Sequence, residues 1–275
     1  MLGSILKQLF THRTPASDRP APASPGTKSP AGSPEPAGDE HVFRIDWGLH
    51  GLLGLLAEYQ FSTVLDIGSG QGEHARLLRR FNKEVYAVDL NREADYVGDF
   101  LEIDFNRRFD AIWCSHVLEH QRNVGRFLDK LFACLEENGV LAISVPCHPR
   151  SRLVPGHVTT WNAGLLCYNL VLAGFDCREA RFIQTVDLSL LVRKRRATGP
   201  DIGTSAASGL DLEDGDSLAA LARFFPFPVE GVIDAEVLEC DWVPRPYALR
   251  LPAGAGKLKI VGRFLPPEGF GIGSD

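Results

Sequence analysis

Three glycines that follow an apolar run are the residues best suited to bind a ligand. Residues 64–74 read VLDIGSGQGEH, so Gly68, Gly70 and Gly72 stand at alternate positions after an acid. Glycine lets the backbone turn sharply and approach a ligand closely, and a helix that starts at once offers unpaired N–H groups. The pattern therefore predicts a strand, a ligand-binding turn and a helix in direct succession.

The spacing of these glycines distinguishes between two kinds of ligand. The dinucleotide fingerprint G-x-G-x-x-G would place its third glycine at position 73, where this chain has Glu73. Asp66 and Glu73, on either side of the turn, would also repel a pyrophosphate. A nicotinamide-dependent oxidoreductase is therefore disfavoured, and the loop suits a ligand that carries positive charge.

A further acid stands where a ribose would be bound. Asp89 ends the next apolar run, and it follows Gly72 at close to the roughly 20-residue offset at which an acid of a Rossmann fold meets ribose hydroxyls. A carboxylate can accept both hydroxyl hydrogens at once, which neutral side chains do less well. We therefore expect Asp89 to bind a ribose, with Asp66 facing the charged end of the same ligand.

These motifs resemble, in the same order, those of the class I S-adenosylmethionine-dependent methyltransferases, a family with a Rossmann-like fold. The resemblance covers residues 60–192, and its last motif departs from the family's usual Leu-Lys-Pro-Gly-Gly in residue type but not in length. Five stretches carry it: 64–74, 85–89, 98–100, 109–120 and 135–141. It implies that the chain binds S-adenosylmethionine and transfers its methyl group.

The resemblance also implies which residues hold the cofactor. Asp99 would receive the adenine amino group beside the apolar wall of Phe100, although an Asp before an apolar residue also commonly caps a turn. The expected cofactor-binding residues are Asp66, Gly68, Ser69, Gly70, Gly72, Asp89, Leu90, Asp99, Phe100, Ser115 and His116.

Histidines are the candidate acid–base residues. Methyl transfer is an in-line displacement that needs the acceptor atom held at ~3–3.5 Å and water excluded, and it needs a base only where the acceptor releases its proton reluctantly. His116 follows a predicted strand, at the edge where open sheets bind ligands. We expect His116 and His157 to be catalytic, and His120 to have a structural role at the start of a helix.

The acceptor pocket is expected near the loop after the fifth predicted strand. Residues 155–162 resemble a family segment that borders this pocket, in which a His precedes a polar or aromatic stretch and a helix. We expect His148, His157 and Trp161 to bind the substrate. The alternative is that His157 only caps or packs against the helix that follows.

The elements that must position these residues alternate along the chain. Strands are predicted at 63–67, 84–89, 96–98, 110–114 and 140–145. Helices are predicted at 46–59, 72–80, 121–135 and 162–173. Such alternation indicates a parallel sheet covered on both faces, and strands at 175–183 and 187–192 are close enough that only a hairpin can join them.

The predicted fold class is therefore α/β: a Rossmann-like doubly wound, mostly parallel seven-stranded sheet with an antiparallel last strand, plus a small C-terminal extension. Residues 1–40, rich in Pro, Ala and Ser, are predicted to be disordered. Residues 41–196 would form the S-adenosylmethionine-binding methyltransferase domain. The aromatic and proline clusters of 197–275 would pack on the core and cover part of the carboxyl-end face of the sheet. The alternatives are the opposite face or a contact between two copies.

Composition limits the partners. A net charge of −6 gives no basic face for nucleic acid. No apolar run reaches the ~20 residues that span a bilayer, and no signal peptide is recognisable. The 6 cysteines stand singly, so neither a disulfide framework nor a metal site is expected, and reduced thiols suggest a cytoplasmic protein.

Residues 1–10 have the spacing of an amphipathic helix, which predicts weak docking on a membrane or a partner, unless they are only a frayed terminus.

The expected function is that of a S-adenosylmethionine-dependent methyltransferase that acts at oxygen on a small-molecule or glycan-type acceptor. The absence of a firm catalytic motif leaves an alternative, a non-catalytic scaffold protein that resembles a methyltransferase and binds the cofactor without turnover. The intact loop disfavours the scaffold, because a scaffold needs neither the three glycines nor the acids beside them. The oligomeric state stays open.

Overall fold

Seven strands form the central sheet, in the order β4-β3-β2-β5-β6-β8-β7. Neighbouring strands are parallel, except that β8 runs antiparallel to both β6 and β7. The strands are β2 (Thr63–Ile67), β3 (Glu84–Asp89), β4 (Tyr96–Val97), β5 (Phe109–Ser115), β6 (Leu135–Pro146), β7 (Arg181–Gln184) and β8 (Asp187–Arg193). This arrangement confirms the predicted Rossmann-like sheet with its antiparallel last strand.

The computed structural model describes residues 40–147, 153–195, 221–227, 247–253, 255–262 and 270–272. All of them belong to one compact unit that spans Pro36–Asp275. The predictions for residues 1–10, for the disorder of 1–39 and for His148 lie outside the described residues.

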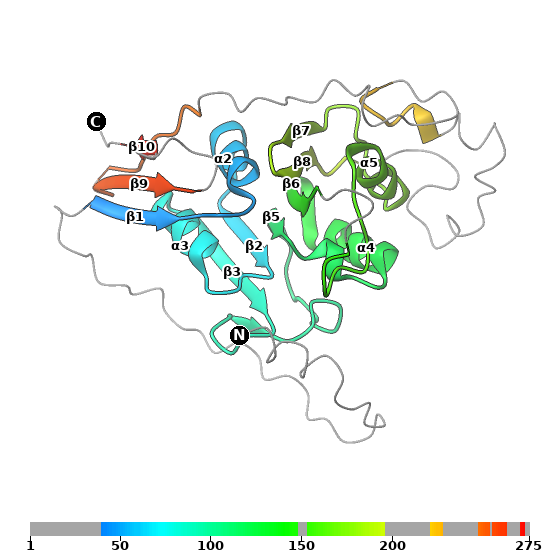
Figure 1. Ribbon diagram of the computed structural model, residues 1–275, viewed down its shortest axis with the longest axis horizontal. Coiled ribbons are helices and arrows are strands. Elements are labelled where there is room, and N and C mark those ends of the chain that lie inside the picture. The colour runs from blue at the N-terminus through cyan, green and yellow to red at the C-terminus, as the bar shows by residue number, and fades with distance from the viewer. Residues whose placement is uncertain are drawn as a thin grey trace, which may run out of the picture. The chain divides into compact units, whose positions relative to one another are not determined.

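Both faces of the sheet are buried, as a parallel sheet requires. Along β2, Leu65 and Ile67 join one apolar cluster, while Val64 joins another. The first cluster includes side chains of α4 (Val124–Cys134) and α5 (Ala163–Leu172), and the second includes side chains of α2 (Leu49–Glu58) and α3 (Glu73–Arg80). Figure 1 shows α2 and α3 toward one side of the sheet and α4 and α5 toward the other. The alternating side chains of each strand therefore hold helices on opposite faces.

The segment after β5 differs from the prediction. A helix was expected from residue 121 with His120 at its start, but Leu118–His120 forms a separate 3-10 turn, η1, and α4 begins only at Val124. The separation arises because Gln121 is extended, with φ −84° and ψ 123°, which ends the turn before α4 can start. His120 therefore lies on a rigid turn at the carboxyl end of β5.

A second sheet joins the two ends of the unit. Its strands are β1 (Glu40–Arg44), β9 (Lys257–Val261) and β10 (Phe270–Ile272), with β1 parallel to β9 and β10 antiparallel to β9. Glu40, placed in the disordered segment by the sequence, belongs to β1. Phe43, Leu258 and Ile260 join the same apolar cluster as α2 and α3. The sheet thus packs on that side of the domain.

The described parts of 197–275 also contact the core on the side of α5. Leu221, Phe224 and Phe225 belong to the cluster that includes α5, and the N–H of Cys177 donates to the carbonyl of Phe224 at 2.9 Å. Coverage of the carboxyl-end face stays a prediction. Within the described ranges, no helix is long and apolar enough to cross a membrane.

Candidate active site

The glycine turn lies at the carboxyl ends of β2 and β3. The N–H groups of Gly68 and Ser69 both donate to the carbonyl of Val88, at 2.8 and 3.2 Å, and Gly72 N–H donates to the carbonyl of Ser69 at 2.8 Å. These bonds fold the turn over the end of β3. Helix α3 begins at the next residue, Glu73, so the predicted succession of strand, turn and helix is confirmed.

Two glycines of the turn have left-handed backbones but different surroundings. Gly68 has φ 74°, and a Cβ there would lie 2.2 Å from Cγ2 of Val117. Gly70 has φ 54°, but a Cβ there would meet no atom within 4 Å. Gly68 therefore permits close packing within the protein, whereas the backbone of Gly70 borders open space that a ligand can enter.

Asp89 links the turn to the end of β3. Its Oδ2 accepts from Gly70 N–H at 2.8 Å, and its Oδ1 accepts from Asn91 N–H at 2.8 Å. Each carboxylate oxygen can accept a further hydrogen bond, so the acid retains capacity for two ribose hydroxyls. Beside it, the side chain of Leu90 is 70% exposed, which is unusual for leucine and leaves an apolar surface next to the turn.

Asp99 and Phe100 follow β4. Asp99 Oδ1 accepts from Leu101 N–H at 2.9 Å, so the acid caps a turn. This was the alternative role that the sequence offered for Asp99. Phe100 is 5% exposed and packs edge-on against Phe127 at 5.1 Å between ring centroids. The turn cap uses one oxygen of Asp99, and binding of an adenine by these two residues stays a prediction.

Asp66 is a buried acid at the end of β2. The residue is 1% exposed, and its Oδ2 has no hydrogen-bond partner among the described residues. Burial raises the pKa of Asp66 to about 7. The charge of Arg79 acts to lower this pKa, and the charge of Asp89 acts to raise it. A buried carboxyl without a partner costs free energy, and a cationic ligand would remove that cost.

His116 stands directly after β5 with a left-handed backbone, φ 56°. Its Nε2 lies 3.2 Å from Oδ1 of Asp187, and its Nδ1 lies 3.2 Å from Oγ of Ser115. Asp187 Oδ2 in turn accepts from Gly48 N–H at 2.6 Å. The ring of Trp47, 42% exposed, lies 5.3 Å from the imidazole of His116. The sequence analysis did not select Asp187, because it had read the residue only as the first of a strand.

Two more histidines, His74 and His50, lie close enough to His116 or Asp187 to be affected by their charge. His74 accepts from the indole N–H of Trp113 through Nδ1 at 3.0 Å, and burial lowers its pKa to about 4. Burial also lowers the pKa of His50, while Asp187 acts in the opposite direction. Both imidazoles are therefore neutral at pH 7.

A second group of polar side chains lies next to η1. Glu119 is fully buried, and neither of its carboxylate oxygens has a hydrogen-bond partner among the described residues. His120 Nε2 lies 3.7 Å from Glu119 Oε1, and the rings of His120 and His157 are 4.9 Å apart and nearly perpendicular. The fold thus brings together three residues with metal-ligand chemistry. The sequence analysis missed this group because His157 is distant in the chain.

The predicted acceptor-binding residues separate into two environments. His157 is half-buried beside His120, and Asn162 rather than His157 caps helix α5 by accepting from Leu165 N–H at 2.8 Å. Trp161 is 7% exposed and belongs to the core cluster, with its indole N–H donating to Oγ1 of Thr159 at 3.0 Å. Trp161 therefore supports the loop that carries His157 from within.

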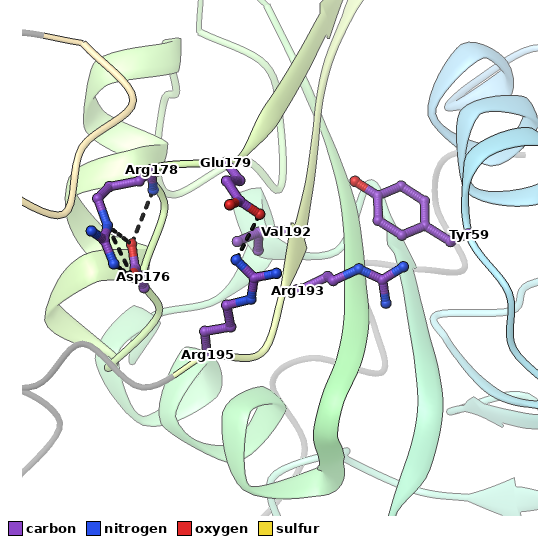
Figure 2. A pocket seen from close by; sticks show the side chains of 7 residues that line it. All are labelled: Tyr59, Asp176, Arg178, Glu179, Val192, Arg193 and Arg195. Atoms are coloured by element: carbon purple, nitrogen blue, oxygen red, sulfur yellow. Dashed lines mark hydrogen bonds and ion pairs between the residues drawn. The ribbon is translucent and has the colours of Figure 1, made fainter.

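A separate cavity of about 210 Å³ lies near the far end of β8. Figure 2 shows two ion pairs among its charged side chains, while Arg193 extends toward the ring of Tyr59. Arg178 binds Asp176 through Nη2 at 2.5 Å, and Arg195 binds Glu179 at 2.6 Å. Its lining residues are Tyr59, Asp176, Arg178, Glu179, Val192, Arg193 and Arg195. Arg193 ends β8, which runs antiparallel to β6. The cavity therefore lies at the amino edge of the parallel strands, opposite the carboxyl edge that carries His116.

Curated relatives match part of the chain. Ubiquinone biosynthesis O-methyltransferase of Bradyrhizobium diazoefficiens is 33% identical over 97 residues, which are 30% of this chain and 38% of that protein. Malonyl-[acyl-carrier protein] O-methyltransferase of Salmonella typhimurium is 26% identical over 122 residues, 40% of this chain and 49% of that protein. The chain spans less than half the length of these relatives.

Solved structures also match part of the chain. A S-adenosylmethionine-dependent methyltransferase of Archaeoglobus fulgidus has 17% identity and a TM-score of 0.44, over 53% of this chain and 91% of that one. A 1,6-didemethyltoxoflavin-N1-methyltransferase of Burkholderia thailandensis has 20% identity and a TM-score of 0.42, over 52% of this chain and 76% of that one.

The family described as a methyltransferase domain matches residues 19–175. Since that match covers more than half of the chain, the protein belongs to the methyltransferase-domain family.

Proposed function

We propose that the chain binds S-adenosylmethionine at the carboxyl edge of β2 and β3 and transfers its methyl group to an oxygen of a small-molecule or glycan-type acceptor. The observation that carries the proposal is the buried Asp66 carboxyl, which has no partner at Oδ2 among the described residues and lies just before the glycine turn. Membership of the methyltransferase-domain family agrees with it. Both curated relatives are named O-methyltransferases, which supports oxygen as the acceptor atom.

The residues present fit this cofactor. Asp66 would face its ammonium group, the backbone of Gly70 would border it, and Asp89 would accept from its ribose hydroxyls. Leu90 offers an exposed apolar surface beside the ribose acid. The bound cofactor supplies a methyl group that its sulfonium activates for displacement.

The chain's own residues would manage the acceptor's proton. Oδ1 of Asp187 lies 3.2 Å from Nε2 of His116, although the two atoms do not have hydrogen-bond geometry. A small rotation of the imidazole would let Asp187 favour the tautomer with its hydrogen on Nε2. Nδ1 is then the basic nitrogen, and it lies beside the hydroxyl of Ser115. In the proposed reaction Nδ1 of His116 would accept the acceptor's hydroxyl proton while the acceptor's oxygen takes the methyl group; the carbon–sulfur bond breaks and S-adenosylhomocysteine is the leaving group. Trp47 provides an aromatic wall that helps to exclude water.

Calorimetric titration of the full chain with S-adenosylhomocysteine tests the cofactor site. We expect one binding site per chain. An absence of binding at millimolar ligand would contradict the proposal.

A scaffold protein that binds the cofactor without turnover is the competing function, and homocysteine-coupled screening of hydroxyl acceptors separates the two. The pairing of His116 with Asp187 favours the enzyme, because a scaffold has no need of an oriented base. Cofactor binding without methyl transfer to any acceptor, in both extract and purified libraries, would instead support the scaffold.

A further inference from the structure

We propose that Glu119, His120 and His157 bind a divalent transition-metal ion of the zinc type beside the candidate active site. One ligand atom from each of these residues lies within 4.8 Å of the others. The side chains come from two segments: η1, which follows β5, and the loop of residues 153–162, which follows the undescribed residues 148–152. Metal binding stands independently of the proposed methyl transfer.

The first observation is the state of Glu119. This residue is fully buried, and both carboxylate oxygens lack hydrogen-bond partners among the residues that the structure describes. Leaving a buried carboxyl unpaired costs free energy, so natural proteins pair such groups or use them to coordinate metal ions. Nε2 of His120 lies 3.7 Å from Oε1 of Glu119, a distance too long for a hydrogen bond.

The second observation is the orientation of His120. Its Nδ1 lies 2.8 Å from the carbonyl oxygen of Gly156. Donation from Nδ1 to a carbonyl leaves Nε2 as the basic nitrogen, and this is the arrangement that orients histidine ligands in metal sites. Nε2 is also the atom that faces Glu119. The backbone therefore selects the tautomer that a metal ion requires.

The third observation is the connection between the two segments. The carbonyl of Glu119 accepts from the N–H groups of Val158 and Thr159, at 2.8 and 3.2 Å. His157 N–H donates to the carbonyl of Val154 at 3.0 Å, which closes a turn in the loop. These bonds hold the imidazole of His157 against that of His120. The ligand set is thus organised by the backbone rather than by chance contact of exposed side chains.

The donor set indicates the class of metal. Two imidazoles and one carboxylate suit zinc and the neighbouring transition metals, whereas magnesium and calcium prefer sites made of oxygen atoms. Ligand atoms around a tetrahedral zinc ion lie about 3.4 Å apart, given bonds of about 2.0–2.1 Å. A small inward movement of the side chains would therefore complete the site.

Three protein ligands leave at least one coordination position open, as in zinc sites that act in catalysis.

Titration of the untagged, chelator-treated full chain with Zn²⁺ alone tests the site. We expect one tightly bound equivalent per chain in the unmodified protein and in His41→Ala, a control histidine on β1. Glu119→Gln and His157→Ala should each weaken the binding at least tenfold. Replacement by Co²⁺ should give visible absorption in the unmodified protein that both of these variants lose.

The controls separate this proposal from the cofactor site. Thermal unfolding and titration with S-adenosylhomocysteine should be unchanged in Glu119→Gln and His157→Ala, which shows that both variants fold. Equal zinc affinity in these variants and the unmodified protein, or no zinc binding at all, would overturn the metal site. Zinc binding without S-adenosylhomocysteine binding would leave the metal site intact and refute the proposed function.

Discussion

Oδ1 of Asp187 lies 3.2 Å from Nε2 of His116, although the two residues are far apart in the chain. His116 follows β5 at the carboxyl edge of the sheet. Asp187 begins β8, which starts at that same edge because it runs antiparallel to β6. The reversed strand thus supplies an acid at the place where parallel strands end.

Replacing Asp187 with Asn should slow methyl transfer by about 100-fold, the lower range for a positioned acid–base residue. Asn keeps a carbonyl oxygen for Gly48 N–H but removes the negative charge beside His116. The measurement is kcat with an acceptor found by the homocysteine screen. Ser189→Ala on the same strand is the control and should retain activity. An unchanged kcat in Asp187→Asn would contradict the assignment of His116 as the base.

Replacing Asp89 with Ala should weaken S-adenosylhomocysteine binding by about 1.5–3 kcal/mol, the usual value of hydrogen bonds to a charged group. The substitution removes the oxygens that contact the turn at Gly70 and Asn91. Glu84→Ala, at the other end of β3, is a matched control that calorimetry should find unchanged. Equal affinity of the two variants would refute the ribose site.

S-adenosylhomocysteine affinity should depend on pH through Asp66. Its pKa of about 7 means that the free protein must release a proton before it can bind an ammonium group. The apparent Kd should therefore be about tenfold higher at pH 6 than at pH 8. Asp66→Asn should bind weakly and show no such dependence. A pH-independent Kd in the unmodified protein would place the ammonium elsewhere.

Asp66 should also make the stability of the protein depend on pH. Its ionised form, which favours ligand binding, should lower the free energy of unfolding. The folded-state pKa of Asp66, about 7, is above its ordinary value of 3.8, so the folded protein holds the proton more tightly between these values. The free energy of unfolding contributed by Asp66 should therefore fall as pH rises from about 4 to 7 and stay low above pH 7. Relative to the unmodified protein, Asp66→Asn should gain stability across that window, by up to about 4 kcal/mol. Denaturant unfolding at pH 4.5 and pH 8 measures the difference, and a gain that does not grow with pH would contradict it.

Alanine at Gly68 and at Gly70 should have different effects. Both positions have left-handed backbones, so each substitution costs about 1 kcal/mol for backbone strain. Only at Gly68 would the added Cβ collide with Val117, which should destabilise the fold by about 1–3 kcal/mol more. Gly70→Ala should instead act mainly on S-adenosylhomocysteine affinity, because its Cβ would enter the open space of the site. Equal losses of stability in the two variants would contradict this distinction.

Local patterns determined much of the domain. The bounds predicted for Thr63–Ile67 and Glu84–Asp89 agree with β2 and β3, because apolar runs ended by an acid and a glycine turn specify strand and turn through neighbouring residues alone. The hairpin before Asp187 was likewise predicted, because a gap that short leaves no room for a crossover. The family resemblance carried by the same motifs is confirmed by the match to the methyltransferase-domain family.

Contacts between distant segments were decided by the tertiary structure. Strand β1 finds its partner β9 near the other end of the chain, and a five-residue strand carries no signal that names its partner. The pairing of His116 with Asp187, and the approach of His157 to Glu119 and His120, depend on which strands are neighbours and on where each one ends. Sequence specifies the type of each element through local sterics and periodicity, but the packing of the sheet determines which polar groups from distant segments lie close together.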